Sequence, residues 1–445
     1  MTALIPITRG ELAGWLDRLE GAEANWVRQT GFEARAGQIC FMPEPDGSLA
    51  RVVCGVGDEY SLWSLGGLSR DLPPGEYQLE ADWEDPATPL LALGLRLGAY
   101  RFDRYVDHQE STFTLVVPEP HGEEIDRLVV ATELVRDLVT TPAEHMGPLE
   151  LAQATTAVAE AGQAQVRVVE GEALLEQNFP AVHVVGRAAA VAPRLIEMDW
   201  GEEDHPLVAL IGKGVCFDTG GLDLKNAAGM GLMKKDMGGA AHVLGLAQLV
   251  MAAELPVRLK VLIPAVENSV AGNAYRPGDV IATRKGLSVE IGNTDAEGRL
   301  VMSDALVLAC ENEPDIVIDF ATLTGAARVA MGPDVPPFFC NDEALAEDLM
   351  LASEAASDPL WRLPLYAPYR DMLKSPIADL NNIGNTGMGG CITAALFLEH
   401  FVEPSTPWIH VDTYAWNASD RPGRPKGGEA LGLRAMFELL RARYS

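Results

Sequence analysis

The chain has 445 residues, of which 48% are hydrophobic and 22% are charged, so it is long enough for two domains and apolar enough to bury a large core. Asp and Glu total 64 against 34 Lys and Arg, and the resulting formal charge of −30 argues against nucleic acid as a partner, because phosphates would be repelled over most of the surface. Six cysteines without a CxxC spacing argue against a disulfide framework or a zinc knuckle and indicate a reducing compartment.

The N-terminal segment lacks the features of a targeting sequence. It has no basic start followed by an apolar core and a small-residue cleavage site. Elsewhere, no apolar run approaches the roughly 20 residues that cross a bilayer. We therefore expect a cytoplasmic protein without a membrane partner.

Residues 1–120 predict a small N-terminal α/β domain. Pro118 and Pro120 mark its end. The hydrophobic pattern predicts the following elements in it: a helix over 10–28, a strand over 49–56, a helix over 90–105 and an extended segment over 113–120.

Residues 121–445 predict a linker helix followed by a larger α/β catalytic domain. The helix has acids in its first turn, one apolar face, and Pro142 at its end. Beyond it, apolar runs of strand length alternate with helical patterns, which is typical of a mostly parallel central sheet covered on both faces. The runs lie at 207–212, 258–266, 287–292, 315–321 and 408–413, and two of the helices are expected after Asp236 and over 298–312.

Charged residues follow these runs, where ligands bind in sheets of this kind. Four carboxylates gathered at one edge would repel one another unless they were protonated or neutralised, and two divalent cations would cancel their charge. Oxygen ligands suit Mn²⁺, Mg²⁺ or Zn²⁺, so we predict a dinuclear site that activates a bridging water. The carboxylates are Asp218, Asp236, Asp295 and Glu297; Lys213 and Asp223 lie nearby, and Lys225 and Arg299 are placed to stabilise developing oxyanion charge.

Other interpretations of these residues carry different weight. Single acids after strands commonly cap helices or face solvent. The glycines beside these acids, in GKG, TGG and MGG, indicate tight turns that a solvated surface does not need. Hydrolysis of phosphoesters by two metals also uses clustered carboxylates and remains an alternative. Cys216 and Cys391 lack an evident histidine partner and are predicted to be packed thiols.

Three motifs resemble, in order and spacing, the signature of the leucyl aminopeptidase family of dinuclear metallopeptidases, the cytosol aminopeptidases. They are KGVCFDTGGLDLK at 213–225, MKKDMGGAA at 233–241 and NTDAEGRL at 293–300. The resemblance continues at 321–327, 382–401 and 408–416 and covers most of residues 123–445, whereas the segment after Trp416 departs from the pattern.

The resemblance implies an aminopeptidase that removes N-terminal amino acids when a metal-bridging hydroxide attacks the scissile carbonyl. Lys225 would stabilise the tetrahedral intermediate, and Arg299 would hold a bicarbonate that acts as general base, with Gly298 and Leu323 completing the anion site. The implied metal ligands are Lys213, Asp218, Asp236, Asp295 and Glu297, with Asp218 and Glu297 bridging, and the implied substrate pocket is formed by Met233, Thr322, Leu323 and Gly325.

The family also implies cofactors and partners. The cofactors are two divalent ions per subunit, Mn or Zn with Mg or Co as alternatives, and bicarbonate. The partners are peptides with a free N-terminus and further copies of the chain in a homohexamer built as a dimer of trimers. Some members bind DNA, a role that the net charge of −30 disfavours here. None of the eight histidines falls at an implied ligand position, and His242 is predicted to be a packed helix residue.

Overall fold

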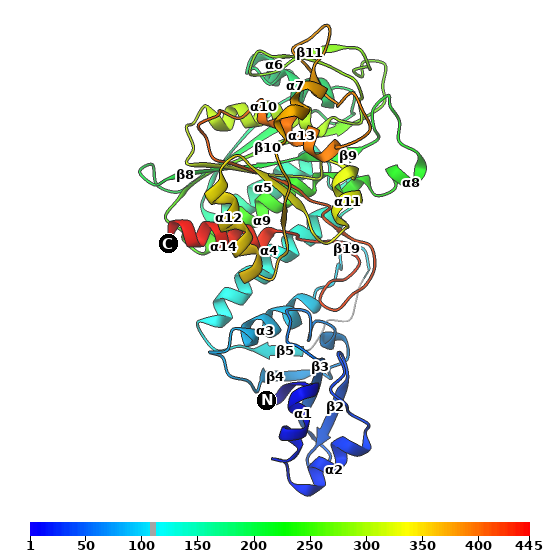
Figure 1. Cartoon of the computed structure of the whole chain (residues 1–445), viewed down its shortest axis with the longest axis vertical. Coiled ribbons are helices and arrows are strands. Elements are labelled where there is room, and N and C mark those ends of the chain that lie inside the picture. The colour runs from blue at the N-terminus through cyan, green and yellow to red at the C-terminus, as the bar shows by residue number, and fades with distance from the viewer. Residues whose placement is uncertain (107–112) are drawn as a thin grey trace. The chain divides into compact units, whose positions relative to one another are not determined.

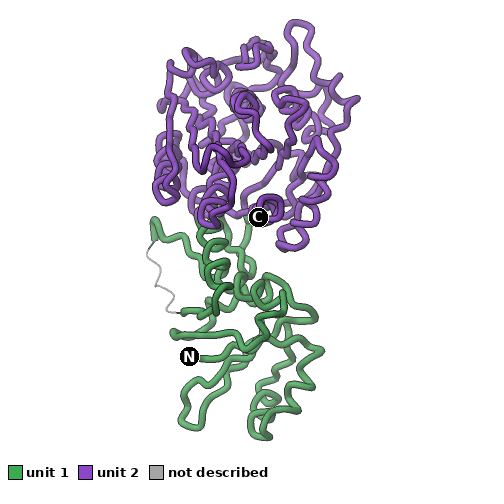
Figure 2. Tube along the Cα trace, turned by 90° about the vertical axis from the view of Figure 1, so that its left-hand side faces the viewer, with its two compact units in different colours: residues 1–133, 417–427 green, residues 134–416, 428–445 purple. Residues whose placement is uncertain are grey.

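The computed structural model describes residues 1–106 and 113–445. The chain folds into two compact units, which Figure 2 shows in different colours: residues 1–133 with 417–427, and residues 134–416 with 428–445. Helix α4 (His121–Thr140) runs from the first unit into the second. Within the described ranges, no helix combines the length and apolar character needed to cross a bilayer.

The first unit is built on a five-stranded sheet with the order β2-β3-β1-β4-β5. Its strands pair in parallel except β2 and β3, which are antiparallel. Leu4, Val52 and Leu95 are fully buried between the sheet and α3, which confirms the α/β class of this part. The elements are β1 (Thr2–Thr8), α1 (Arg9–Leu16), α2 (Gly21–Gln29), β2 (Ile39–Pro43), β3 (Leu49–Gly57), a 3-10 turn (Leu68–Arg70), β4 (Gly75–Leu79), α3 (Ala87–Gly98) and β5 (Phe113–Val116).

The single helix predicted over residues 10–28 is wrong, because the chain breaks between α1 and α2. Trp15 and Val27 pack in the same small core. In one straight helix these positions would face directions about 120° apart, so the break lets both reach that core. Thr8 and Glu11 begin α1 with a reciprocal capping box. The helix predicted over 90–105 is observed as α3, which ends at Gly98.

The second unit contains a nine-stranded sheet with the order β15-β14-β17-β13-β8-β10-β7-β6, and β9 pairs with β10. Its centre, β17-β13-β8-β10, is parallel, as the sequence predicts, and antiparallel pairs flank it. Its strands are β6 (Gln165–Glu170), β7 (Arg194–Trp200), β8 (Leu207–Gly212), β9 (Gly214–Asp218), β10 (Arg258–Asn268), β13 (Ile316–Ala321), β14 (Pro337–Cys340), β15 (Trp361–Arg362) and β17 (Trp408–Asp412).

Helices cover both faces of this sheet, with α5, α9 and α14 on one side and α7, α10 and α13 on the other (Figure 1). Almost every residue of α9 is buried, as expected for a helix that is apolar all round. The longer helices are α5 (Pro148–Gly162), α9 (Gly238–Ala252), α10 (Gly298–Cys310), α12 (Glu343–Ala355), α13 (Gly390–Glu399) and α14 (Leu433–Tyr444). The shorter ones are α6 (Ala173–Glu176), α7 (Pro180–Gly186), α8 (Ala227–Met230), α11 (Gly325–Met331) and the 3-10 turns Ala143–His145, Met233–Met237 and Ala367–Leu373.

The apolar run at 287–292 does not join the central sheet, contrary to the sequence prediction. It forms β12 (Ser288–Glu290), which pairs with β11 (Val280–Ala282) and β16 (Leu380–Asn381) in a separate three-stranded sheet. A short ribbon is made of β18 (Trp416–Asn417) and β19 (Gly427–Gly428). The run at 287–292 is therefore a strand of a small accessory sheet.

Residues 417–427, which lie in the segment after Trp416, belong to the first unit. Gly423 has a φ of +71°, and a Cβ on it would lie 2.4 Å from the Trp63 ring. A Cβ on Gly66 would lie 2.4 Å from the nitrogen of Gly423, so the two backbones approach as only glycines permit. The guanidinium of Arg424 stacks over Trp63 at 4.7 Å. This segment is thus part of the packing of the first unit.

Candidate metal centre and active site

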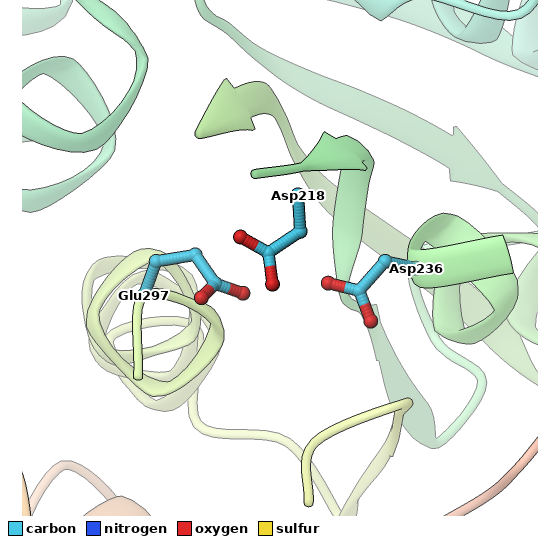
Figure 3. A group of neighbouring side chains, drawn as sticks. All are labelled: Asp218, Asp236 and Glu297. Atoms are coloured by element: carbon cyan, nitrogen blue, oxygen red, sulfur yellow. The ribbon is translucent and has the colours of Figure 1, made fainter. Parts of the chain in front are cut away.

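Three buried carboxylates from separate segments meet at one point of the second unit. Asp218 ends β9, Asp236 lies in the 3-10 turn before α9, and Glu297 is the N-cap residue of α10. Each offers an oxygen atom, and these atoms lie within 4.8 Å of one another. Figure 3 shows the three carboxylates pointing toward a shared space. None is more than 3% exposed, so water does little to screen their repulsion.

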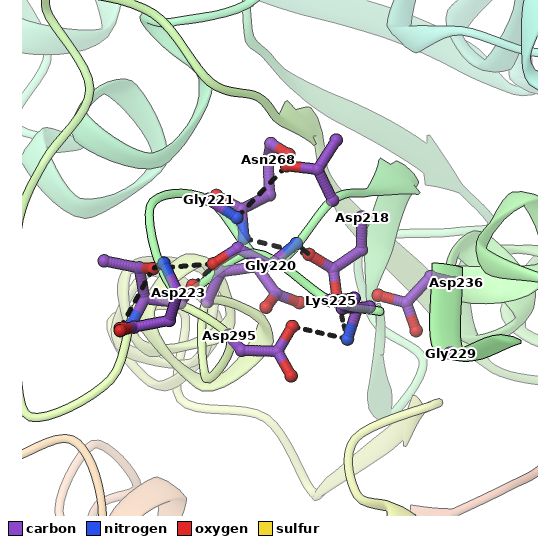
Figure 4. A network of polar contacts seen from close by, with 12 residues as sticks. Asp218, Gly220, Gly221, Asp223, Lys225, Gly229, Asp236, Asn268 and Asp295 are labelled. Carbon is purple, nitrogen blue, oxygen red and sulfur yellow. Dashed lines mark hydrogen bonds and ion pairs between the residues drawn. The ribbon is translucent and has the colours of Figure 1, made fainter. Parts of the chain in front are cut away.

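Two lysines provide part of the counter-charge. Nζ of Lys213 lies 2.7 Å from Oδ2 of Asp236 and 2.9 Å from Oε1 of Glu297. Nζ of Lys225 lies 2.8 Å from Oδ2 of Asp218 and also pairs with Asp295 (Figure 4). Four carboxylates therefore contact two ammonium groups, and negative charge remains in excess.

The pKa values record this imbalance. Burial raises the pKa of Glu297 to about 8, and the charge of Asp218 adds to the shift. Burial also raises the pKa of Asp295, with Asp218 again adding to it. Burial alone would lower the pKa of Lys213, but the charges of Asp236 and Glu297 outweigh burial and raise it. A cation placed among these groups would relieve the cost of keeping Glu297 ionised.

The residues fit divalent cations. Oε2 of Glu297 is buried and has no hydrogen-bond partner among the residues that the structure describes, although its other oxygen meets Lys213. A buried carboxylate oxygen without a partner is costly, and a metal ion would satisfy it. The donor set is dominated by carboxylate oxygens, which suit Mn²⁺, Mg²⁺ and Zn²⁺.

The loop after β9 is tied to the loop before α10 by hydrogen bonds. Nδ2 of Asn268 donates to Oδ1 of Asp218 at 2.9 Å and to the carbonyl of Thr294 at 3.0 Å. The amide of Thr294 donates to Oδ2 of Asp223 at 2.8 Å, so Asp223 braces the loops (Figure 4). Asn268 was not predicted, although it ends β10 and the argument that selected the acids after the strands also applies to it.

The first residue of α10 must be small. A Cβ on Gly298 would lie 2.5 Å from Cε and 2.8 Å from Nζ of Lys213. Glycine therefore lets the Lys213 side chain pass the start of the helix and reach Glu297, whose carboxylate it contacts.

Two residues implied for an anion site are engaged elsewhere in the structure. Nη1 of Arg299 donates to the carbonyl of Asn382 at 2.6 Å, and burial lowers the pKa of Arg299 to about 10. The amide of Leu323 donates to Oδ1 of Asp412 at 3.0 Å. Asp412 ends β17 and was not predicted from the sequence, although its position after a buried strand could have indicated it.

A cavity of about 510 Å³ opens beside the carboxylates, within the size range of small-ligand sites. The four residues implied for the substrate pocket line it together with the implied metal ligands other than Glu297. The lining includes Met233, Thr322, Leu323, Gly325, Lys213, Asp218, Lys225, Asp236 and Asp295.

Comparison with known proteins identifies the family. Residues 133–437 match the model of the cytosol aminopeptidase family, catalytic domain, and residues 2–118 match the M17 aminopeptidase, N-terminal domain. The chain belongs to the cytosol aminopeptidase family. It is 41% identical over 336 residues to Peptidase B of Serratia proteamaculans, an alignment that covers 73% of this chain and 78% of that protein.

Solved structures of cytosol aminopeptidase relatives share the fold. The cytosol aminopeptidase from Coxiella burnetii is 50% identical, with a TM-score of 0.97, and the match covers 100% of this chain and 98% of that one. The bottromycin maturation enzyme BotP in complex with Mn is 34% identical, with a TM-score of 0.89 over 99% of each chain. As a cytosol aminopeptidase family member, the chain is a hydrolase of the metal-dependent peptidase class.

The structure of this cytosol aminopeptidase family member agrees with two predictions: that His242 is a packed helix residue, and that Cys216 and Cys391 are packed thiols. Nδ1 of His242 donates to the carbonyl of Gly238, its Nε2 accepts from the amide of Leu431, and burial lowers its pKa to about 4. All six cysteines are free and buried. Burial raises the pKa of Cys216 and of Cys391, so neither is primed as a nucleophile.

Proposed function

We propose that the chain is an aminopeptidase with two divalent cations held by Lys213, Asp218, Asp236, Asp295 and Glu297. The observation that carries the proposal is the convergence of three buried carboxylates on a space next to a partnerless oxygen of Glu297. When bound, the cations, Mn or Zn with Mg or Co as alternatives, would supply a water of lowered pKa and polarise the scissile carbonyl. Asp218 and Glu297 are proposed as the bridging ligands.

Lys213 would have to lose its proton to act as a ligand. The charges of Asp236 and Glu297 outweigh burial and raise the pKa of this ammonium, so without metal they favour its protonated form. We therefore propose that loading of the site releases a proton from Lys213.

Lys225 is proposed to stabilise the negative charge that develops on the carbonyl oxygen. Its side chain is 16% exposed and lines the cavity, and Asp218 and Asp295 hold its ammonium in place. A charged donor fixed in this way needs little reorganisation during the reaction.

Bicarbonate is proposed as the general base beside Arg299, with Gly298 and Leu323 completing its site. Nε of Arg299 is buried without a partner in the described part of the chain, which leaves a donor for an anion. The amide of Leu323 would first have to leave Asp412. Activity that rises when bicarbonate is added to CO₂-free buffer would support this part, and activity independent of bicarbonate would contradict it.

The proposed substrates are peptides with a free N-terminus, whose first side chain would occupy the pocket at Met233, Thr322, Leu323 and Gly325. We also propose a cytoplasmic location, in keeping with the names of the relatives, and a homohexamer. Light scattering on the purified protein tests the assembly. A monomer at micromolar concentration would overturn the hexamer.

The central experiment measures metal content and turnover together. The protein is stripped with a chelator, reloaded with Mn²⁺ or Zn²⁺, and assayed on leucine p-nitroanilide, with the N-acetylated substrate and a phosphodiester as controls. We expect two ions per chain and cleavage of the free-amine substrate alone. Lys225→Ala should keep its ions and lose turnover by about a hundredfold or more. Cleavage of the phosphodiester instead would favour the two-metal phosphoesterase.

A further inference from the structure

Lys235 places an ammonium group in the wall of the substrate cavity. It lies in the 3-10 turn Met233–Met237, directly before Asp236, and is 6% exposed. It lines the cavity together with Met233 and Thr322. A buried ammonium is costly unless a partner satisfies it, so its surroundings are informative.

The structure gives this ammonium a long carboxylate contact and no hydrogen bond among the described residues. The recorded carboxylate contact of Nζ is Oδ1 of Asp236, at 3.8 Å, which is too long for a hydrogen bond. That oxygen already accepts from Oγ1 of Thr322 at 2.9 Å, and Oδ2 of Asp236 meets Lys213. Among the described residues, Lys235 makes no hydrogen bond through Nζ, and its other contact is the Tyr414 ring at 5.5 Å.

The neighbouring wall adds positive charge. The guanidinium of Arg328, on the exposed side of α11, lies 4.9 Å from the same Tyr414 ring. Asp412 lines this wall too, but it accepts from the amides of Leu323 and Thr324 and from the Thr324 hydroxyl. The cavity therefore presents a cation whose recorded carboxylate contact is long, at 3.8 Å, in a chain whose net charge is −30.

We infer that Lys235 selects substrates whose N-terminal residue is acidic, because a side-chain carboxylate of that residue would give its ammonium the close partner that Asp236, at 3.8 Å, does not supply. The inference rests on the proposed function. Nζ of Lys235 lies 3.8 Å from Asp236, one of the residues proposed to hold the cations. The scissile bond is proposed to lie at those cations, so a substrate group that reaches Nζ would belong to the residue beside that bond. The carboxylate at the C-terminus of a substrate peptide lies farther from the scissile bond, so it is a weaker candidate for the partner of Lys235.

The test compares glutamyl and glutaminyl p-nitroanilides, which have nearly the same shape, differ in charge and carry no terminal carboxylate. The wild-type metal-loaded enzyme should cleave the glutamyl substrate with the higher kcat/KM. Lys235→Met should lower the ratio of the two kcat/KM values by about tenfold, the size expected for a buried charge pair, while kcat/KM for leucine p-nitroanilide stays within about threefold. Lys235→Arg should keep the preference.

Lys234→Met is the matched control. Its Nζ contacts the carbonyl of Thr140 and lies 5.5 Å from the Trp416 ring, and it does not line the cavity, so the ratio should not change. A wild-type ratio of one or less overturns the inference, and this comparison needs no variant to fold. An equal loss on all substrates in Lys235→Met also overturns it. The inference is also overturned if Lys235→Met lowers kcat/KM for leucylglycine but not for leucylglycine amide. That result would assign Lys235 to the terminal carboxylate of the peptide. Failure of the wild type on every aminoacyl substrate would instead overturn the proposed function.

Discussion

Replacing Glu297 by Gln tests whether its carboxylate holds a cation. The change keeps the shape of the side chain and removes the ability to ionise from a residue that is 1% exposed. In the metal-free protein the Glu297 pKa of about 8 leaves this carboxyl mostly protonated near pH 7, so glutamine replaces a side chain that is already largely neutral beside Lys213 and Asp218. We therefore expect the metal-free variant to fold with a stability within about 1 kcal/mol of the wild type.

The metal-bound state should differ far more. A metal at about 100 times its Kd stabilises the native protein by about 2.7 kcal/mol, and a hundredfold loss of affinity leaves about 0.4 kcal/mol at the same concentration. For a unit of about 300 residues, each kcal/mol shifts Tm by about 1.6 °C. The rise in Tm on adding Mn²⁺ should therefore fall from about 4 °C to less than about 1 °C.

Thermal unfolding with and without Mn²⁺ measures this difference, and metal analysis of the same samples gives the stoichiometry. Hydrolysis of leucine p-nitroanilide should fall by about a thousandfold or more. An unchanged Tm rise together with near-normal turnover would show that Glu297 holds no cation, and the assignment of the dinuclear centre would fail with it.

Three further outcomes are expected. Gly298→Ala should displace the Lys213 side chain and lower kcat by at least about tenfold, while Gly272→Ala, whose added Cβ meets nothing within 4 Å, should leave it unchanged. Nδ1 of the buried His410 lies 2.6 Å from Oδ1 of Asp319, whose charge outweighs burial and raises the pKa of His410. The charged pair therefore stabilises the fold fully below about pH 6.5, the pKa of an unfolded histidine, and this stabilisation is lost as pH rises through the folded pKa. In urea unfolding, the stability difference between wild type and His410→Gln should therefore shrink from about pH 6 to about pH 9, and a constant difference would refute this. Metal loading should release protons in weakly buffered solution, and loading without release would argue that Lys213 stays protonated.

The convergence of Asp218, Asp236 and Glu297 was predictable because acids that follow strands of such a sheet gather at one edge. Asp218 and Asp236 border the loops at the ends of parallel strands, and glycines beside them reveal close packing. The same rule applies to Asn268 and Asp412, which end β10 and β17. Asn268 acts through its hydrogen bond to Asp218, and Asp412 acts through its hydrogen bond from the amide of Leu323. Both pairings are set by tertiary contacts, which the local sequence does not reveal.

The fold was predictable where the signal is local and less so where it depends on distant pairing. The buried central strands and α9 have continuous apolar patterns that need no partner to be recognised. Strand β1 and the short strands β2 and β4 were not predicted. The run at 287–292 looks like a central strand, but its pairing with residues 380–381, about ninety positions away, places it in another sheet. Its loop nevertheless delivers Glu297 to the cluster, because α10 begins immediately after that residue.

The return of residues 417–427 to the first unit limits how this chain can be divided. A gene split after residue 133 would yield an N-terminal fragment with Trp63 uncovered and a C-terminal fragment carrying Gly423 and Arg424 without the surface against which they pack. A chimera that exchanges the first unit with that of a relative must therefore transplant two separate stretches together. A protease that cuts once within α4 would break the covalent link between residues 1–133 and residues 417–427, and the N-terminal fragment would then stay bound only through packing such as the Trp63 contacts with Gly423 and Arg424. Retention of that fragment on a sizing column therefore reports on this packing.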